Sequence, residues 1–270
     1  MSLRNLKGAI QNIMATKRNT KQRRHAILKC LEEQGEVTVE QLVNQFETSE
    51  VTIRKDLSAL EQNGLLLRRY GGAVLMPADV LAEEEIEALS PQKVAIAKIA
   101  AAQIRDHNRI IIDTGSTTSA LISQLNKKQG LVVMTNSLSV AAELRQLENE
   151  PTLLMTGGTW DASSDSFQGK VAEQVLRSYD FDQLFIGADG IDLQRGTTTF
   201  NELVGLSRVM AEVSREVIVM VESQKIGRKM PNLELTWQQI NCLITDDHID
   251  AAIKQQIENL GVDVLIAATN

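Results

Sequence analysis

Short loops rich in glycine, hydroxyl and acidic side chains recur along the larger, C-terminal part of the chain. They are DTGSTT (113–118), TNS (135–137), TGG (156–158), GADGID (187–192) and SQKIGR (223–228). Loops of this composition leave backbone N–H groups available to bind phosphate. Carboxylates in them can accept hydrogen bonds from sugar hydroxyls, and a lysine can pair with a phosphate. Although glycine and serine are common in any connecting loop, the five together favour a pocket for a phosphorylated sugar.

Individual residues in or near these loops have distinct expected roles. Asp189 and Glu202 are the candidate acceptors for sugar hydroxyls, and Lys225 is the candidate partner of the phosphate. The remaining residues expected in the pocket are Asp113, Gly115, Ser116, Thr117, Thr135, Asn136, Gly157 and Gly158.

The elements that position these loops are apolar, β-branched runs that alternate with helical patterns. Seven runs are strand-like: 109–113, 131–135, 152–156, 183–187, 216–221, 241–245 and 262–267. Amphipathic helical patterns lie between several of them, at 118–125, 140–147 and 250–260. This alternation predicts an α/β fold with a doubly wound parallel sheet. Ligands of such sheets bind beyond the carboxyl ends of the strands, where the five loops are expected.

A second group of polar residues, in SEVTIRKDL (49–57), suits a different partner. Arginine can make two hydrogen bonds to a guanine edge, threonine can contact a thymine methyl group or a phosphate, and lysine neutralises phosphate charge. Thr52, Arg54 and Lys55 supply these three residue types within four positions. They indicate contact with double-stranded DNA if one helix presents them together. The alternative is an amphipathic helix whose solvent face is merely basic.

The surrounding pattern predicts three short helices and a hairpin. Apolar residues recur at helical spacing after Thr20, Thr38 and Ser49, and the last two are placed as N-caps. The segment LLLRRYGGAVL (65–75) is typical of two short strands joined at its glycines. Three helices followed by a hairpin form a winged helix-turn-helix.

The third helix would present the polar group to DNA. Ile53, Leu57 and Leu60 share its buried face, which turns the polar side chains outward near the end that enters the major groove. Arginines of the wing and the basic stretch 17–29 would add phosphate contacts. The residues expected to contact DNA are Arg24, Ser49, Thr52, Arg54, Lys55, Arg68 and Arg69.

Charge divides the 270-residue chain into the same two parts. Residues 1–76 contain 12 basic and 8 acidic side chains, a balance of +4, although the whole chain carries −7. The remainder is acidic, beginning with ADVLAEEEIEALSP (78–91). We expect an N-terminal extension (1–20), a DNA-binding domain (21–76), an acidic linker (77–92) and an effector-binding domain (93–270).

Composition also limits the class of protein. No apolar run approaches the roughly 18 residues of a membrane span, and no secretory segment is present. The two cysteines are far apart in the sequence and suggest no disulfide framework. A cytoplasmic protein without a membrane partner is the expectation. The three histidines lack metal-ligand spacing, and with no P-loop or CxxC motif neither a metal nor a cofactor is expected.

The chain from about residue 21 to 266 resembles the DeoR family of bacterial transcriptional regulators. The S-x-x-T-I-R-x-D-L helix and a wing containing R-x-Y-G-G-A carry the resemblance. MTNSL, GGTWDASSDSFQG, FDQLFIGADGIDL and TTFNE make it most similar to repressors of glucitol (sorbitol) and N-acetylgalactosamine operons. The resemblance implies a repressor whose sensor domain, similar to ribose-5-phosphate isomerase, binds a phosphorylated sugar or sugar alcohol and then releases operator DNA. The two-fold symmetry usual for such operators predicts a dimer or tetramer.

The competing interpretation is an isomerase-like enzyme. DTGSTT and GADGID also resemble ribose-5-phosphate isomerase, and Asp189, Asp192 and Glu202 could serve as acid/base groups for an aldose–ketose proton shift. That isomerase has a lysine in a glycine-rich segment after its acidic loop, whereas LQRGTTTFNE (193–202) has none. A regulator without catalytic residues is therefore favoured. A scaffold protein without a ligand would leave the five loops unexplained.

Overall fold

The computed structural model describes residues 20–61, 65–69, 71–75, 89–162, 164–201 and 203–269. Within the chain, 1–86 and 87–270 form two compact units. The predicted N-terminal extension, apart from Thr20, and most of the predicted acidic linker lie outside the described residues. Glu202, one of the expected effector ligands, also lies outside them.

The N-terminal unit is a winged helix-turn-helix, as predicted. Its elements are α2 (Thr20–Gln34), β1 (Glu36–Thr38), α3 (Val39–Phe46), α4 (Glu50–Glu61), β2 (Leu66–Arg69) and β3 (Gly72–Leu75). The predicted hairpin is β2–β3, and β1 joins it to make a three-stranded antiparallel sheet in the order β1-β3-β2. The core between helices and sheet includes Ile27 and Leu31 of α2, Leu42 of α3, and Ile53 and Leu57 of α4.

Local sequence explains how these elements begin and meet. The Thr38 hydroxyl accepts a hydrogen bond from the Gln41 N–H at 3.1 Å, and the Gln41 side chain accepts one from the Thr38 N–H at 2.7 Å. This capping box starts α3. Gly72 is required for strand pairing, because a Cβ there would lie 2.2 Å from the Val37 carbonyl oxygen.

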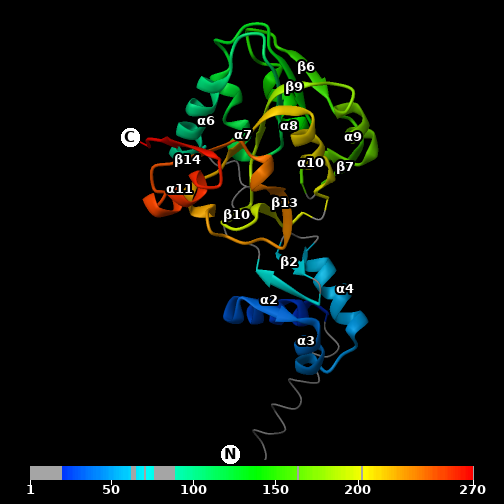
Figure 1. The fold of residues 1–270 in the computed structure, drawn as a ribbon. Coiled ribbons are helices and arrows are strands. Elements are labelled where there is room, and N and C mark those ends of the chain that lie inside the picture. Colours follow the sequence, from blue (N-terminus) through cyan, green and yellow to red (C-terminus); the bar gives the residue numbers. More distant parts are fainter. Residues whose placement is uncertain are drawn as a thin grey trace, which may run out of the picture. The chain divides into compact units, whose positions relative to one another are not determined.

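The C-terminal unit is built on a seven-stranded parallel sheet (Figure 1). Its strands are β4 (Arg109–Ile112), β5 (Val132–Thr135), β6 (Thr152–Met155), β9 (Phe181–Ile186), β12 (Ser214–Met220), β14 (Cys242–Asp246) and β15 (Asp263–Ala267). Their order is β15-β14-β12-β9-β4-β5-β6, so the chain winds outward in one direction from β4 and then in the other from β9. All seven predicted strands are present, and the predicted fold class is confirmed.

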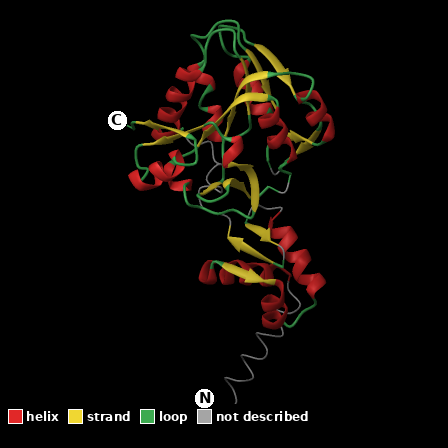
Figure 2. Ribbon diagram, viewed as in Figure 1, coloured by secondary structure: helices red, strands yellow, loops and turns green. Residues whose placement is uncertain are grey.

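Helices cover both faces of this sheet, which is why its strands are apolar almost throughout (Figure 2). Ile110 and Ile112 of β4 pack in one core, whereas Ile111 between them packs in the other. The first core contains residues from α6 (Pro91–Gln103), η2 (Ile122–Gln124) and α8 (Leu138–Leu144), and also Ala120 and Leu121, which follow the short helix α7 (Ser116–Ser119). The second contains residues from α9 (Lys170–Leu176), α10 (Gly205–Glu212) and α11 (Ala251–Glu258).

Smaller elements follow the strand ends. A hairpin consists of β7 (Thr159–Asp161) and β8 (Ser166–Gln168), and a three-stranded antiparallel sheet contains β10 (Gly190–Asp192), β11 (Gly196–Thr199) and β13 (Asn232–Thr236). Two 3₁₀ turns, η3 (Ser223–Lys225) and η4 (Trp237–Gln239), complete the order. This three-stranded sheet contains two acidic residues, Asp192 of β10 and Glu234 of β13.

Candidate functional site

Helix α4 presents the predicted polar surface. Ile53 and Leu57 are buried, while Arg54 and Lys55 are exposed and Thr52 is half-buried. Ser49, just before the helix, accepts a hydrogen bond from the Thr52 N–H at 3.2 Å. Local periodicity therefore turns the DNA-contacting residue types of α4 outward, as the sequence indicated.

The exposed arginines of α4 and of the wing are paired with acidic residues of the same unit. Arg54 contacts Glu50 at 2.6 Å, one turn earlier on α4, and Arg69 of the wing contacts Glu36 at 2.8 Å. Arg68 contacts Glu61 at 3.3 Å. These pairs are exposed and therefore weak, so a DNA phosphate or guanine can replace the carboxylate at little cost.

Arg24 occupies a different environment from the other predicted DNA contacts. Its Nε lies 3.0 Å from Asp56, and the Arg23 guanidinium contacts the same carboxylate at 2.5 Å. Asp56 and Arg23 are buried, and Arg24 is half-buried. The two arginines thus tie α2 to α4. Sequence reasoning missed Asp56, although its place beside Leu57 on the inner face of α4 was a signal for burial.

In the larger unit, four of the five predicted ligand loops follow the neighbouring strands β12, β9, β4 and β5, on both sides of the point between β4 and β9 where the winding of the sheet reverses. We call this the strand-end site, formed by the loops that follow β4, β5, β9 and β12. Asp113 directly follows β4, and its N–H donates to the Phe185 carbonyl of β9 at 3.0 Å. Binding sites of open α/β sheets lie at this kind of reversal.

Asn136 connects the first two loops of the strand-end site. Its Nδ2 donates to Asp113 Oδ1 at 2.7 Å, and its Oδ1 accepts from the Thr114 N–H at 3.1 Å. Thr135 is fully buried, and its hydroxyl accepts from the Ser137 N–H at 3.1 Å. Asn136 therefore orients the Asp113 carboxylate, whereas Thr135 supports the loop from inside.

The glycine and hydroxyl residues predicted in the pocket lie in turns near Asp113 and Asn136. Gly115 precedes the short helix α7 with φ 139°, and Ser116 and Thr117 form its first turn. Gly157 and Gly158 lead into the β7–β8 hairpin with φ values of 60° and 112°. A Cβ on Gly158 would lie 2.5 Å from the Gln168 carbonyl oxygen, so this glycine is needed to close the hairpin.

The hairpin itself is attached to the strand-end site. The Phe167 N–H of β8 donates to the Asn136 carbonyl at 2.8 Å. Asp165, in the turn between the strands, accepts a hydrogen bond from the Ser139 hydroxyl at 3.1 Å, and its backbone carbonyl accepts one from the Thr114 hydroxyl at 3.4 Å. The loops after β4, β5 and β6 are thereby joined.

The negative charges of three carboxylates interact in the strand-end site. Asp189 follows β9 and accepts a hydrogen bond from the Thr199 hydroxyl at 2.6 Å. Burial raises the pKa of Asp113 to about 6, and the negative charge of Asp189 adds to the rise while the Asn136 and Thr114 hydrogen bonds oppose it. The third carboxylate, Glu234 of β13, was not anticipated from the sequence.

The pKa of Glu234 is raised further than that of Asp113. Burial raises its pKa to about 8, and the charges of Asp113 and Asp189 contribute to the rise, although the Ser207 hydroxyl donates to Glu234 Oε1 at 2.8 Å. Its signal in the sequence was a lone acid between two leucines in NLELT (232–236), a strand that the periodicity analysis did not identify.

Lys225 lies beyond the next strand of the sheet, β12. Its side chain is buried in the turn η3, with 7% of its surface exposed. The loop that carries it is joined to the loop of Asp189, because the Gly227 N–H donates to the Ile191 carbonyl at 2.9 Å. A buried lysine beside an acidic loop is suited to hold an anionic group of a ligand whose hydroxyls face the carboxylates.

Asp192 does not have the environment of a general base. Although burial favours its neutral form, hydrogen bonds from Arg195 and the Gln194 N–H and the charge of Lys229 lower its pKa. The Arg195 guanidinium lies 2.8 Å from its carboxylate. This ion pair holds the carboxylate in a structural role.

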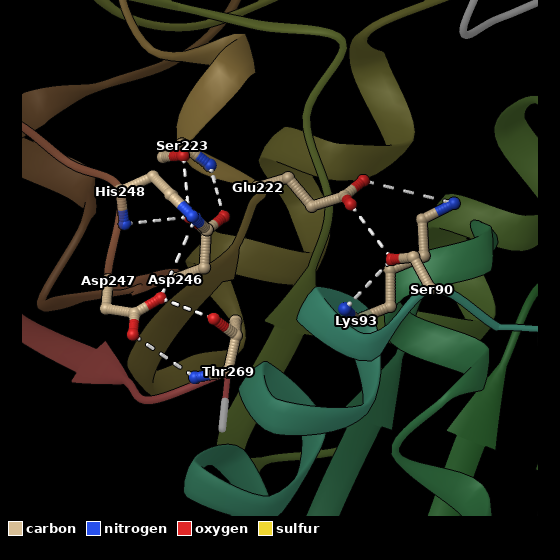
Figure 3. A network of polar contacts seen from close by, with 8 residues as sticks. All are labelled: Ser90, Lys93, Glu222, Ser223, Asp246, Asp247, His248 and Thr269. Atoms are coloured by element: carbon tan, nitrogen blue, oxygen red, sulfur yellow. Dashed lines mark hydrogen bonds and ion pairs between the residues drawn. The ribbon is translucent and has the colours of Figure 1, made fainter.

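A second polar cluster lies beyond β14. The carboxylate of Asp246 accepts hydrogen bonds from the Ser223 N–H and hydroxyl, each at 2.7 Å, and from the His248 N–H at 3.1 Å (Figure 3). Asp247 accepts from the Thr269 hydroxyl at 2.7 Å. Asp246, Asp247 and His248 have potential metal-ligand atoms within 4.8 Å of one another. Because donors of the protein already occupy the carboxylates, the cluster fastens loops together.

A hollow of about 440 Å³ lies at the amino-terminal ends of β4, β9 and β12, opposite the strand-end site. Its lining includes Arg109, Arg177 and Arg215. Arg177 contacts Glu212 at 3.0 Å and Arg215 contacts Asp182 at 3.8 Å, so two of these arginines already have carboxylate partners. The strand ends, by contrast, carry buried acidic residues and a buried lysine on adjacent loops.

Comparisons with known proteins agree with this two-part organisation. Residues 23–78 match the DeoR-like helix-turn-helix domain, and residues 89–247 match the DeoR C terminal sensor domain. A protein of Escherichia coli O157:H7 assigned as an aga operon transcriptional repressor is 38% identical over 92% of this chain and 94% of its own length. The transcriptional regulator GolR of Listeria innocua is 30% identical over 91% of this chain and 98% of its own length.

Solved structures similar to this chain share only its general fold. Ribose 5-phosphate isomerase A of Methanocaldococcus jannaschii is 20% identical, with a TM-score of 0.37, over 50% of this chain and 53% of that protein. The beta subunit of eIF2B from Chaetomium thermophilum is 11% identical, with a TM-score of 0.40, over 72% of this chain and 53% of that one. Neither similarity is strong enough to inform function.

The family matches decide between the two interpretations of the sequence. They span both units, and the similar curated proteins are transcriptional regulators rather than enzymes. Among the described residues, no helix is long and apolar enough to cross a lipid bilayer. The chain belongs to the DeoR family of transcriptional regulators.

Proposed function

We propose that this protein represses a sugar or sugar-alcohol catabolic operon in the cytoplasm and leaves its operator when a phosphorylated sugar or sugar alcohol binds the strand-end site. It would bind double-stranded DNA through α4 and the wing. Two-fold operators favour a dimer or tetramer, because each half-site then meets one helix-turn-helix unit.

The DNA-binding half of the proposal rests on residue types and their exposure. Thr52, Arg54 and Lys55 lie on the outer side of α4, and Arg68 and Arg69 lie on the wing strand β2. Base contacts from α4 would determine sequence preference, whereas the wing arginines would contact phosphates. We assign Arg24 an indirect part, because its guanidinium is directed at Asp56.

The observation that carries the effector half is the placement of Asp113, Asp189 and Lys225 beyond the ends of neighbouring strands, at the point where the sheet reverses its winding. A phosphorylated sugar has the complementary chemistry, since its hydroxyls donate to carboxylates and its phosphate pairs with an ammonium group. The similarity to the E. coli aga operon repressor supports control of a carbohydrate operon.

The proposal is tested by operator binding. Full-length protein is used to select its preferred duplex from a random pool, and affinity is then measured at one fixed salt concentration. Glucitol 6-phosphate, glucose 6-phosphate and galactosamine 6-phosphate are added separately, each beside its unphosphorylated counterpart and inorganic phosphate. We expect at least one sugar phosphate to weaken operator binding about tenfold or more, in the range of typical allosteric coupling. Operator affinity that no phosphorylated compound changes would contradict the effector half of the proposal.

A further inference from the structure

The carboxylate of Glu222 connects the loop after β12 with the first helix of the larger unit (Figure 3). Glu222 immediately precedes the turn that contains Lys225, and only 7% of its surface is exposed. Its Oε1 accepts a hydrogen bond from the Ser90 hydroxyl at 3.0 Å, and its Oε2 lies 4.0 Å from Lys93 Nζ. A buried carboxylate needs such partners, so this contact is an integral part of the fold.

Ser90 also controls how α6 begins. It is the N-cap of that helix, and its hydroxyl oxygen accepts a hydrogen bond from the Lys93 N–H at 3.1 Å. The same hydroxyl donates to Glu222, so one atom joins the helix start to the loop after β12. In the sequence, Ser90 is the second-last residue of the acidic segment 78–91, here called the connecting segment, which spans the boundary between the two units. The N-terminus of α6 is therefore, in sequence order, the first described element of the larger unit.

The turn between Glu222 and Lys225 has little freedom of its own. The Lys225 N–H donates to the Glu222 carbonyl at 2.9 Å, which closes the turn. Asp246 accepts from both the backbone and the hydroxyl of Ser223, at 2.7 Å each. A ligand that displaces the backbone at Lys225 would therefore displace the backbone of Glu222 as well, since a hydrogen bond of the turn joins the two.

We propose that the Ser90–Glu222 contact couples the effector site to the connecting segment, so that phosphate binding at Lys225 alters the start of α6 and thereby the DNA-binding unit. This inference rests on the effector role proposed above for Lys225. A phosphate brings negative charge to the turn that begins at the buried Glu222 carboxylate, and like charges in a poorly solvated site repel each other strongly. The two states of the turn would differ in how firmly Glu222 holds Ser90, which is the differential interaction that a ligand needs in order to shift an equilibrium.

The test uses the full-length protein, the selected operator duplex and whichever of the three sugar phosphates releases the parent. Ser90→Ala and Glu222→Gln are expected to retain operator affinity and sugar-phosphate affinity within about threefold. The ratio of operator affinities without and with sugar phosphate should fall from tenfold or more to below about threefold. Coupling is reciprocal, so the sugar phosphate should also bind these variants equally well with and without operator, unlike the parent.

Two further substitutions separate coupling from capping. Ser90→Thr keeps the hydroxyl and should keep the full response. Ser90→Gly is tolerated at an N-cap far better than alanine but also removes the donor to Glu222, and should lose the response like Ser90→Ala. Ser178→Ala is the matched control, because it removes a serine hydrogen bond to the Gln174 carbonyl at the end of α9. It should respond like the parent.

The outcomes distinguish this inference from the proposed function. A parent that releases the operator while Ser90→Ala, Ser90→Gly and Glu222→Gln release it equally well would overturn the coupling role alone. Loss of response in Ser90→Ala with retention in Ser90→Gly would also overturn it, by showing that only the cap matters. A parent that none of the three sugar phosphates releases would overturn both.

Discussion

Arg54 lies 2.6 Å from Glu50 on the exposed side of α4, one helical turn apart. In this position the guanidinium is held by a carboxylate that contributes only a few tenths of a kcal/mol to helix stability. It can therefore leave Glu50 for a guanine edge, where a bidentate contact discriminates between bases by about 1–3 kcal/mol.

The first prediction separates base reading from phosphate contact. Arg54→Ala should weaken binding to the selected operator by about 1–3 kcal/mol and relax preference at one base pair. Arg69→Ala, on the wing, should weaken all sequences similarly and reduce the salt dependence of binding. Affinities for a set of duplexes with single base changes distinguish the two. Sequence-independent losses of equal size in both variants would refute base contact by Arg54.

A second prediction concerns the buried ion pairs of Asp56. Asp56→Asn leaves Arg23 buried without its full counter-charge, and breaking such a pair costs about 3–5 kcal/mol. The control is Glu50→Gln on the same helix, which removes an exposed pair and should cost below about 1 kcal/mol. Circular dichroism would follow unfolding of the whole chain.

Tryptophan fluorescence supplies an internal reference for that experiment, because both tryptophans, Trp160 and Trp237, belong to the larger unit. The fluorescence transition should be unchanged in Asp56→Asn while the circular dichroism trace gains an earlier transition. If the two variants unfold alike, the Asp56 pairs do not hold α2 and α4 together.

Much of the fold follows from local pattern. The seven strands were predictable because each is a short apolar run between loops, and the winged helix because Ile53, Leu57 and Leu60 repeat at helical spacing. The prediction of a helix at 118–125 was wrong, because the chain forms α7 and the separate 3₁₀ turn η2 there. Helix α6 was partly assigned to the linker, since its alanine-rich sequence has little amphipathic contrast.

The site was predictable where it follows strand order and not where it depends on tertiary contacts. Asp113 and Asp189 were anticipated because each follows a strand, and the carboxyl ends of parallel strands share an edge. Glu234 comes from an antiparallel strand, β13, whose position beside β11 no periodicity reveals. The Ser90–Glu222 hydrogen bond joins residues 132 positions apart, so no local pattern could indicate it.

A third prediction uses the raised pKa values. Burial raises the pKa of Glu234 to about 8 and that of Asp113 to about 6, above their ordinary values of 4.5 and 3.8. The folded state therefore binds more protons than the unfolded state between about pH 4 and 8, and stability falls as pH rises through this window. Between pH 6 and 8 Glu234 dominates, with a slope of up to about 1.4 kcal/mol per pH unit.

Glu234→Gln tests this assignment. Glutamine keeps an acceptor for Ser207 but cannot ionise, so the variant should lose less stability than the parent between pH 6 and 8. Tryptophan fluorescence during denaturant unfolding reports the larger unit at each pH. Parent and variant differ only at position 234, so the contributions of all other groups cancel in the comparison. Parallel stability curves for parent and variant would show that Glu234 is already ionised at neutral pH.

The final prediction addresses the effector ligands directly. Lys225→Ala removes the proposed phosphate partner, and Asp189→Asn removes the charge of an acceptor for sugar hydroxyls while preserving its shape. Because the residues proposed to contact DNA belong to a separate compact unit, both variants should bind the selected operator like the parent. Neither should release it at the sugar-phosphate concentration that releases the parent. Lys98→Ala, an exposed lysine of α6, is the matched control and should respond normally.

Direct calorimetric titration with the sugar phosphate separates loss of binding from loss of signalling in these variants. Lys225→Ala and Asp189→Asn should lose heat of binding, whereas the Ser90 and Glu222 variants should retain it. If Lys225 is only a buried structural residue and Asp189 only an acceptor for Thr199, both substitutions will lower the unfolding midpoint by tryptophan fluorescence but leave release intact. Operator release at the parental sugar-phosphate concentration would thus exclude the strand ends as the effector site and place it elsewhere in the larger unit.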